Sequence, residues 1–243
     1  MFCIFAAYNL TQKMEKDTLP KRLLIGLSLT IVIFAASILL GQALKFETDI
    51  IPTSFVTHAL MLVLSVALIV VMRKQVNYRI AMPKFKQVLK PIIIGFVTSL
   101  VINLAIGILT IVLTGKANAH PAVAKESVLQ FFLFTFILAS VAEEFLFRGF
   151  LQNYLKPFSD KGFNLFRRWI SLPVLVSAVT FSLAHLILLV SGVEALFMIR
   201  MLVFTFALGL IAGYYQEKYD NHAFAIIVHM AGNLMGLVSI LMM

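Results

Sequence analysis

Charge is scarce in this sequence. Only 13% of its 243 residues are Asp, Glu, Lys or Arg, whereas 61% are hydrophobic, and the mean hydropathy is +0.98. Soluble domains carry about 25% charged residues, so this chain has too little polar surface to cover a water-soluble globule. Cysteine is scarcer still, because the single Cys3 excludes an internal disulfide framework and a thiolate metal cluster. We therefore expect an integral membrane protein.

Long apolar runs take the place of the missing charge. Seven of them approach the roughly 20 residues that an α-helix needs to cross a bilayer. The sequence thus predicts an all-α fold, a polytopic transmembrane helical bundle of about seven spans. The predicted spans are 22–44, 52–72, 91–115, 128–154, 169–190, 195–215 and 221–243.

The basic residues follow the alternation of the connections between spans. Fifteen lysines and arginines fall in the amino-terminal segment and in the second, fourth and sixth connections, whereas three fall in the others. Lys and Arg are enriched in cytoplasmic connections, which predicts a multi-pass protein of the cell membrane with a cytoplasmic amino terminus. Residues 1–21 are expected to form a cytoplasmic or interfacial segment. These basic connections suit anionic lipid head groups, and we expect no nucleic-acid partner.

A few ionisable side chains lie inside the hydrophobic spans. Nine of the eleven carboxylates fall in tails or connections, but Glu143 and Glu144 are adjacent within the fourth span. An ionisable group at bilayer depth costs at least about 2.5–3.5 kcal/mol, so its presence indicates a functional site. The other polar groups in the spans that draw attention are Arg148, His185, His229 and Asn233.

Helical geometry separates the two glutamates. Successive residues project about 100° apart, so Glu143 and Glu144 do not face the same point. Glu144 and Arg148 are an i, i+4 pair with the acid first, which favours an ion pair and leaves Glu143 to point elsewhere. His229 and Asn233 are also four residues apart and share one helix face. Because Glu143, His185 and His229 all lie near mid-membrane depth, the three spans are predicted to surround one polar pocket.

These residue types indicate an activated water molecule. A desolvated glutamate is a competent general base, a neighbouring imidazole can orient the same water, and an imidazole and an amide can donate hydrogen bonds to an oxyanion. The same set also fits a catalytic zinc site with Glu143, His185 and His229 as ligands. The spacing alone does not separate the two chemistries. The histidines near span ends, His58, His120 and His222, are expected to be interfacial, as is Arg200 near the outer end of its span.

Three short motifs lie in order on separate hydrophobic spans. EEFLFR at 143–148 fits EExxxR, FSLAH at 181–185 fits FxxxH, and HMAGN at 229–233 fits HxxxN. Together they resemble the CAAX protease and bacteriocin-processing family of intramembrane peptidases, of which the type II CAAX prenyl endopeptidases are members. The resemblance covers roughly residues 128–243, including the glycine-spaced segment FALGLIAGYY. Some members of the family have eight spans, so the resemblance allows an eighth span here.

The resemblance implies a role for each motif residue. Glu143 and His185 would activate the attacking water, and His229 with Asn233 would form the oxyanion hole. Glu144, Arg148 and Phe181 would support the site, Phe181 by shaping the pocket wall. Members of the family are often labelled metalloproteases, although a glutamate-activated water without metal is also proposed for relatives. The cofactor is therefore none or zinc, and we favour the metal-free chemistry.

The predicted function is that of an intramembrane endopeptidase. Its substrate would be a hydrophobic or membrane-associated peptide, CAAX-like or bacteriocin-related. The alternative is a non-proteolytic immunity or scaffold protein that sequesters a membrane-active peptide or another membrane protein. In either case the chain is one membrane domain, with amino-terminal helices over 22–127 and catalytic helices over 128–243.

Overall fold

The structure is a computed structural model that describes residues 18–44, 46, 48, 50–115 and 126–242. Within these residues seven helical segments are long and apolar enough to cross a membrane. They are Leu19–Ala43, Ser54–Val71, Phe85–Thr114, Val128–Phe158, Leu172–Val190, Ala195–Tyr219 and Ala223–Leu241. The predicted all-α bundle of seven spans is confirmed, with boundaries shifted by a few residues. Most of the predicted interfacial segment 1–21 lies outside the described residues, and the first helix already begins at Leu19.

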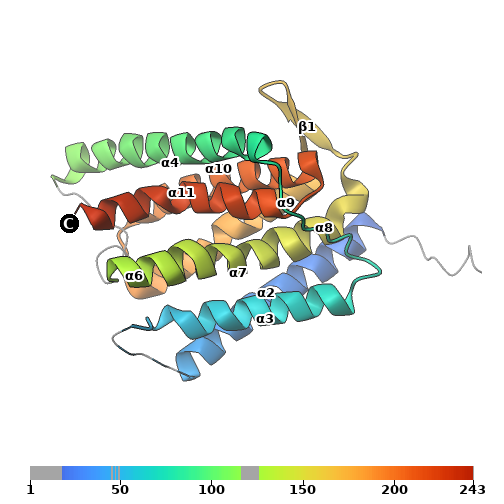
Figure 1. Cartoon of the computed structure of the whole chain (residues 1–243), viewed down its shortest axis with the longest axis horizontal. Helices are drawn as coiled ribbons and strands as arrows, with labels where there is room; N and C mark the ends of the chain where they lie inside the picture. Colours follow the sequence, from blue (N-terminus) through green and yellow to red (C-terminus); the bar gives the residue numbers. More distant parts are fainter. Residues whose placement is uncertain (1–17, 45, 47, 49, 116–125, 243) are drawn as a thin grey trace, which may run out of the picture.

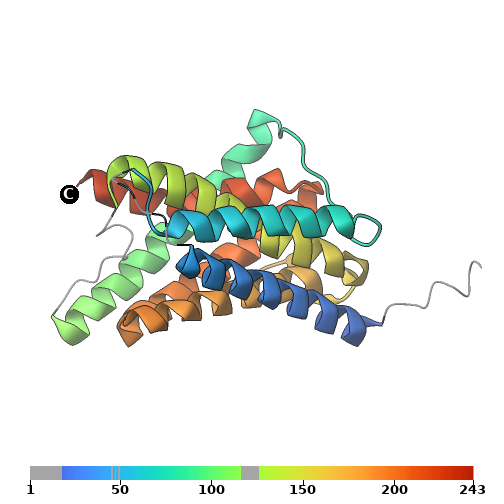
Figure 2. The same ribbon diagram turned by 90° about the horizontal axis from the view of Figure 1, so that it is seen from below.

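The fourth span runs between two groups of helices (Figure 1). On one side α2 (Leu19–Ala43) packs on α3 (Ser54–Val71). On the other side α10 (Ala195–Tyr219) packs on α4 (Phe85–Thr114), α9 (Leu172–Ala184) and α11 (Ala223–Leu241). In Figure 2, α4 is inclined to α3 and to the fourth span. The paired glutamates of the fourth span therefore lie in the middle of the bundle.

The fourth span changes its helical geometry several times along its length. It begins at a capping box in which Ser127 Oγ accepts from the Gln130 amide at 3.2 Å and Gln130 Oε1 accepts from the Ser127 amide at 2.8 Å. Wide π-helical turns are uncommon and often occur at functional sites. The glutamate pair lies on a short α-helical segment between two such stretches. The elements are α6 (Val128–Gln130), π-helical η1 (Phe131–Ala139), α7 (Ser140–Glu144), π-helical η2 (Phe145–Gln152), α8 (Asn153–Leu155) and 3-10 η3 (Lys156–Phe158).

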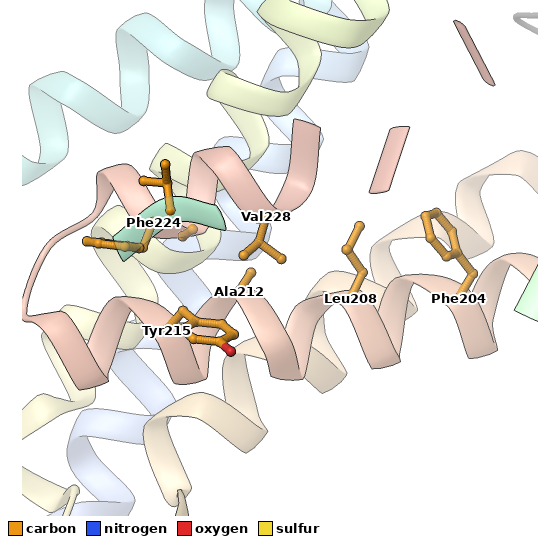
Figure 3. Packing of buried hydrophobic residues seen from close by; sticks show 8 residues of the cluster. Phe204, Leu208, Ala212, Tyr215, Phe224 and Val228 are labelled. Carbon is orange, nitrogen blue, oxygen red and sulfur yellow. The ribbon is translucent and has the colours of Figure 1, made fainter. Parts of the chain in front are cut away.

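Close packing joins α10 to α11. Figure 3 shows Leu208, Ala212 and Tyr215 of α10 against Phe224 and Val228 of α11. A Cβ atom at Gly232 would lie 2.7 Å from both terminal carbons of Leu208. Small residues let membrane helices approach closely, so this glycine permits the contact that fixes α11, and with it His229, against α10.

Two connections between the spans have defined local structure. In the segment VNYRIAMPKFKQVLK the helix begins at Phe85. Before it, the side-chain amide of Asn221 accepts from the Ala81 N–H at 3.1 Å and donates to the Ala81 carbonyl oxygen at 2.9 Å. In the fourth connection β1 (Gly162–Leu165) pairs antiparallel with β2 (Arg168–Ser171). The hairpin turns at Phe166 and Arg167, which adopt positive φ of 47° and 64°.

Candidate active site

A cavity of about 730 Å³ lies within the bundle. The structure brings Glu143 from the fourth span, His185 from the fifth and both His229 and Asn233 from the seventh to its wall. Phe181 lines the same cavity and is buried. All of the sequence-predicted candidate catalytic residues therefore surround one space, which is large enough to receive several side chains of a peptide.

Glu143 faces this cavity. Its side chain is 18% exposed, and its two carboxylate oxygens face different imidazoles. Oε2 lies 3.7 Å from His229 Nε2, and Oε1 lies 3.7 Å from His58 Nε2. These separations exceed a direct hydrogen bond, so the carboxylate remains able to bind a water molecule or a substrate proton.

Glu144 turns away from the cavity into the protein. Its Oε1 accepts a hydrogen bond of 2.9 Å from Arg148 Nη1, so the predicted ion pair is confirmed. The same oxygen lies 2.8 Å from His229 Nδ1, a contact that the sequence did not predict. Because a carboxylate only accepts, the Nδ1 atom of His229 carries a proton, and Nε2 is the nitrogen that faces Glu143.

Arg148 fits beside two glycines of α10. A Cβ atom at Gly209 would lie 2.5 Å from Arg148 Nη2, and one at Gly213 would lie 2.7 Å from Gln152 Oε1. The Phe181 ring closes the other side, with its centroid 4.4 Å from the guanidinium carbon. The glycine spacing in FALGLIAGYY thus makes room for polar side chains of the fourth span.

His185 is held by its own helix. Its Nδ1 lies 2.9 Å from the Phe181 carbonyl oxygen, which can only accept, so Nδ1 donates and Nε2 is left to accept from water in the neutral ring. The Phe181 ring meets His185 edge-on at 4.9 Å and His229 at 5.4 Å between centroids. Phe181 therefore separates and orients the two imidazoles, in line with the wall role that the resemblance implies.

Asn233 is fixed by a hydrogen bond from its Nδ2 to Ser140 Oγ at 3.0 Å. An amide nitrogen has two hydrogens, so one remains for a second acceptor. His229 and Asn233 both line the cavity from one face of α11. Two potential donors of a hydrogen bond are thereby placed on the wall that also carries Glu143.

The three motifs fall within one matching segment. Residues 125–235 match the family model described as type II CAAX prenyl endopeptidase Rce1-like. Over this segment the chain is similar to that family. The similarity to the Rce1-like family indicates a membrane protease. No curated protein and no solved structure matches the chain.

A zinc site in this segment would use Glu143, His185 and His229 as its ligands. Among the described residues, no three His, Cys, Asp or Glu side chains are placed to hold one metal ion. His229 Nε2 lies 3.7 Å from the nearer Glu143 oxygen. As placed among the described residues, these three side chains do not form a zinc centre.

Two histidines expected at the interface lie elsewhere. His58, in the second turn of α3, lines the cavity and faces Glu143. His222 is 1% exposed, with Nε2 on the Glu144 carbonyl oxygen at 3.1 Å and Nδ1 on the Tyr78 hydroxyl at 3.0 Å. Burial lowers the pKa of His222 to about 4 and raises the pKa of the Tyr78 hydroxyl to about 12. His120 lies outside the described residues.

Neither histidine carries a local signal that would have revealed its place. His58 lies outside the segment that matches the Rce1-like family, and only the packing of α3 against the fourth span brings it to Glu143. The amino-terminal helices thus contribute to a site whose recognisable motifs all lie in the second half of the chain.

Arg200, which was expected near the outer end of its span, also lines the cavity. Its guanidinium carbon lies 5.0 Å from the Phe197 ring centroid.

Proposed function

We propose that this protein is an intramembrane endopeptidase that hydrolyses a peptide bond by activating water with Glu143 and His185. One observation carries the proposal: Glu143 presents its carboxylate to a large cavity while its neighbour Glu144 is buried against Arg148. A glutamate that was only structural would be neutralised in the same way as Glu144. The substrate would be a hydrophobic or membrane-associated peptide, CAAX-like or bacteriocin-related.

The reaction needs one base and one oxyanion site. Water held between Glu143 and His185 Nε2 gives a proton to Glu143, and its oxygen forms a bond to the carbonyl carbon of the scissile peptide. The carbonyl oxygen becomes an oxyanion that accepts hydrogen bonds from His229 Nε2 and Asn233 Nδ2. As the C–N bond breaks, Glu143 returns the proton to the leaving nitrogen. The products are a carboxyl terminus and an amine.

This role requires His229 to be an imidazolium. Its Nδ1 donates to Glu144, so a hydrogen on Nε2 makes both ring nitrogens protonated. The Glu144 carboxylate stabilises that positive charge, and Arg148 in turn stabilises the buried carboxylate. In this proposal Glu144 and Arg148 serve catalysis by setting the charge and the orientation of His229.

We further propose that the protein resides in the cell membrane with its amino terminus in the cytoplasm. The described basic residues of the connections support this orientation, because they gather at the end of the bundle that carries the hairpin and the connection between α3 and α4. Those beyond the helices include Arg73, Lys74, Arg79, Lys161 and Arg167. Positive residues favour the cytoplasmic face.

Purified protein tests the proposed activity. The E143Q and H185A variants are expected to lose cleavage of hydrophobic peptides by at least roughly 10²-fold, the usual contribution of a general base. V63A in α3 is the matched control, since Val63 is 63% exposed on the bundle surface. Cleavage that survives in both folded active-site variants would contradict the assignment. A folded E143Q variant that keeps full biological activity would favour the immunity or scaffold alternative.

A further inference from the structure

The cavity occupies one half of the bundle. Along α3 the lining residues fall between Ser54 and Met61, in the half that follows the first connection. Along α10 they lie between Phe197 and Leu208, and along α11 between His229 and Ser239. Because neighbouring helices run in opposite directions, all three stretches belong to the same end. The cavity reaches the connections there, where Pro52, Thr53 and Glu126 line it.

The opposite half of the bundle is closely packed. Phe150, Leu151, Tyr154 and Leu155 of the fourth span are each at most 1% exposed and pack as one cluster with Ile69 and Val76. Arg148 lies between this cluster and the cavity and is fully buried. The packed half ends at the hairpin and the basic connections, whereas the carboxyl end of α11 lies at the other end (Figure 1).

We propose that the active-site cavity opens on the non-cytoplasmic face of the membrane, so that its substrates are hydrophobic peptides held in or delivered to the outer leaflet. The term substrate rests on the proposed function, and the side of opening rests on the proposed orientation. The position of the cavity at one end of the bundle rests on neither. The basic residues mark the packed end as cytoplasmic, and the cavity lies at the other end. An exported hydrophobic peptide would therefore reach Glu143, and a protein confined to the cytoplasm would not.

Cysteine labelling in intact cells tests the side of opening without any assay of cleavage. In a C3S background, T53C places a thiol at the cavity mouth and T57C places one inside the cavity. D160C places a thiol at the exposed basic end as the matched control. With a membrane-impermeant thiol reagent, T53C and T57C are expected to react in intact cells and D160C only after permeabilisation. The reverse pattern would overturn the proposal whether or not the protein is a protease.

A second, independent observation concerns His58. Its Nδ1 lies 2.9 Å from the Ser54 carbonyl oxygen, four residues earlier on α3. His185 makes the same contact with Phe181, at the same 2.9 Å. In both rings Nδ1 must donate, because a carbonyl oxygen only accepts. Each ring thus aims Nε2 into the cavity, His58 from α3 and His185 from the fifth span.

The contact between His58 and Glu143 depends on one proton. A neutral His58 has no hydrogen on Nε2 and presents a lone pair to Glu143 Oε1 at 3.7 Å. A proton on either partner converts this repulsion into attraction. Among the described residues, His185 and His229 also face Glu143, the latter on its second oxygen. Glu126 lies near His58, and its carboxyl group accepts from Thr135 at 2.8 Å.

We infer that His58 is a positioning residue that acts through Glu143, holding its carboxylate opposite His229 and sharing the proton that Glu143 takes from water. No new bond or additional reactant is involved: the proton moves from water to the Glu143–His58 pair and then to the leaving nitrogen. The Rce1-like motifs do not include this residue, so the amino-terminal helices complete the site.

Kinetics over a range of pH distinguish positioning from simple packing. We expect H58A to lower kcat by about 10–100-fold with KM within twofold, and to shift the acidic limb of the kcat/KM profile. H58Q, which restores a hydrogen-bond donor but does not titrate, should recover part of kcat and keep the shifted limb. V63A on the same helix should match the wild type. An unshifted profile in a folded H58A protein, or a loss confined to KM, would overturn the inference.

Discussion

The Nδ1 atom of His229 lies 2.8 Å from Oε1 of Glu144, the same oxygen that binds Arg148 Nη1 at 2.9 Å. The second glutamate of EExxxR is therefore a buried acceptor that holds an imidazole from another span. Glu143, its neighbour in sequence, faces the cavity. One helical step thus separates a group that can reach substrate from a group that orients its partner.

Removing the negative charge of Glu144 should impair catalysis without changing the shape of the substrate cavity. E144Q keeps the shape of the side chain but lowers its ability to stabilise the imidazolium of His229, so we expect kcat to fall by roughly 10²–10⁴-fold. Steady-state kinetics on a peptide substrate measure the effect. Residues that act as a unit are non-additive, so E144Q combined with H229A should be little worse than H229A alone. Multiplicative losses in the double variant would contradict the coupling.

Loss of Arg148 should destabilise the fold more than loss of the pair. R148M leaves the Glu144 carboxylate buried at 1% exposure without the Arg148 guanidinium and with His229 as its remaining partner, and breaking a buried ion pair typically costs about 3–5 kcal/mol. The double variant E144Q/R148M removes both charges and should recover much of that stability, although not the activity. Thermal unfolding in detergent provides the comparison. R168M is the control, since Arg168 bonds to Tyr214 at the surface; an equal loss there would refute the argument.

A methyl group at Gly209 should disturb the site through Arg148. In G209A the new Cβ atom would lie 2.5 Å from Nη2 and 3.1 Å from the Ala178 backbone, so the guanidinium must shift. Such overpacking typically costs about 1–3 kcal/mol, and activity should fall with stability. G107A provides a matched control, because its nearest neighbour is 4.0 Å away. Equal unfolding temperatures and activities for the two variants would show that the glycine is not needed there.

His222 should make the protein less stable in acid. Its pKa is held at about 4 by burial, whereas an unfolded histidine titrates near about 6.5. Above that pH the ring is neutral in both states. Below it the unfolded chain binds a proton that the folded chain does not, so the free energy of unfolding falls as the pH drops from about 6.5 to about 4. The slope is at most about 1.4 kcal/mol per pH unit.

The H222Q variant isolates this contribution. Glutamine retains a donor for the Glu144 carbonyl oxygen but does not titrate in this range. The difference in unfolding temperature between wild type and H222Q, measured from pH 7.5 to pH 4, should change by the amount that His222 contributes. If the two curves stay parallel, His222 does not control acid stability.

Much of the bundle follows from local properties of the sequence. Hydropathy identifies the seven spans, because each must be long and apolar to cross a bilayer. The 100° step between residues separates Glu143 from Glu144, and the i, i+4 spacing predicts the contact with Arg148. These properties depend on one helix at a time, so no knowledge of the packing is needed.

Contacts between helices are where sequence reasoning fails. The positions of His58 and His222 depend on how α3 and the turn before α11 pack against the fourth span. The hairpin was missed because its turn uses Phe166 and Arg167 at positive φ, where glycine or asparagine would have been the expected signal. Local patterns do not encode which side chain of another span will meet a buried carboxylate.

The packed half of the bundle also bears on what happens after cleavage. Hydrolysis creates a carboxylate and an amine, and both are far better solvated in water than among apolar side chains. At the basic end Phe150, Leu151 and Tyr154 are each at most 1% exposed. In the proposed reaction both fragments would therefore depart through the mouth by which the substrate arrives. Ionisation of the newly formed ends would drive that departure and clear the site for the next peptide.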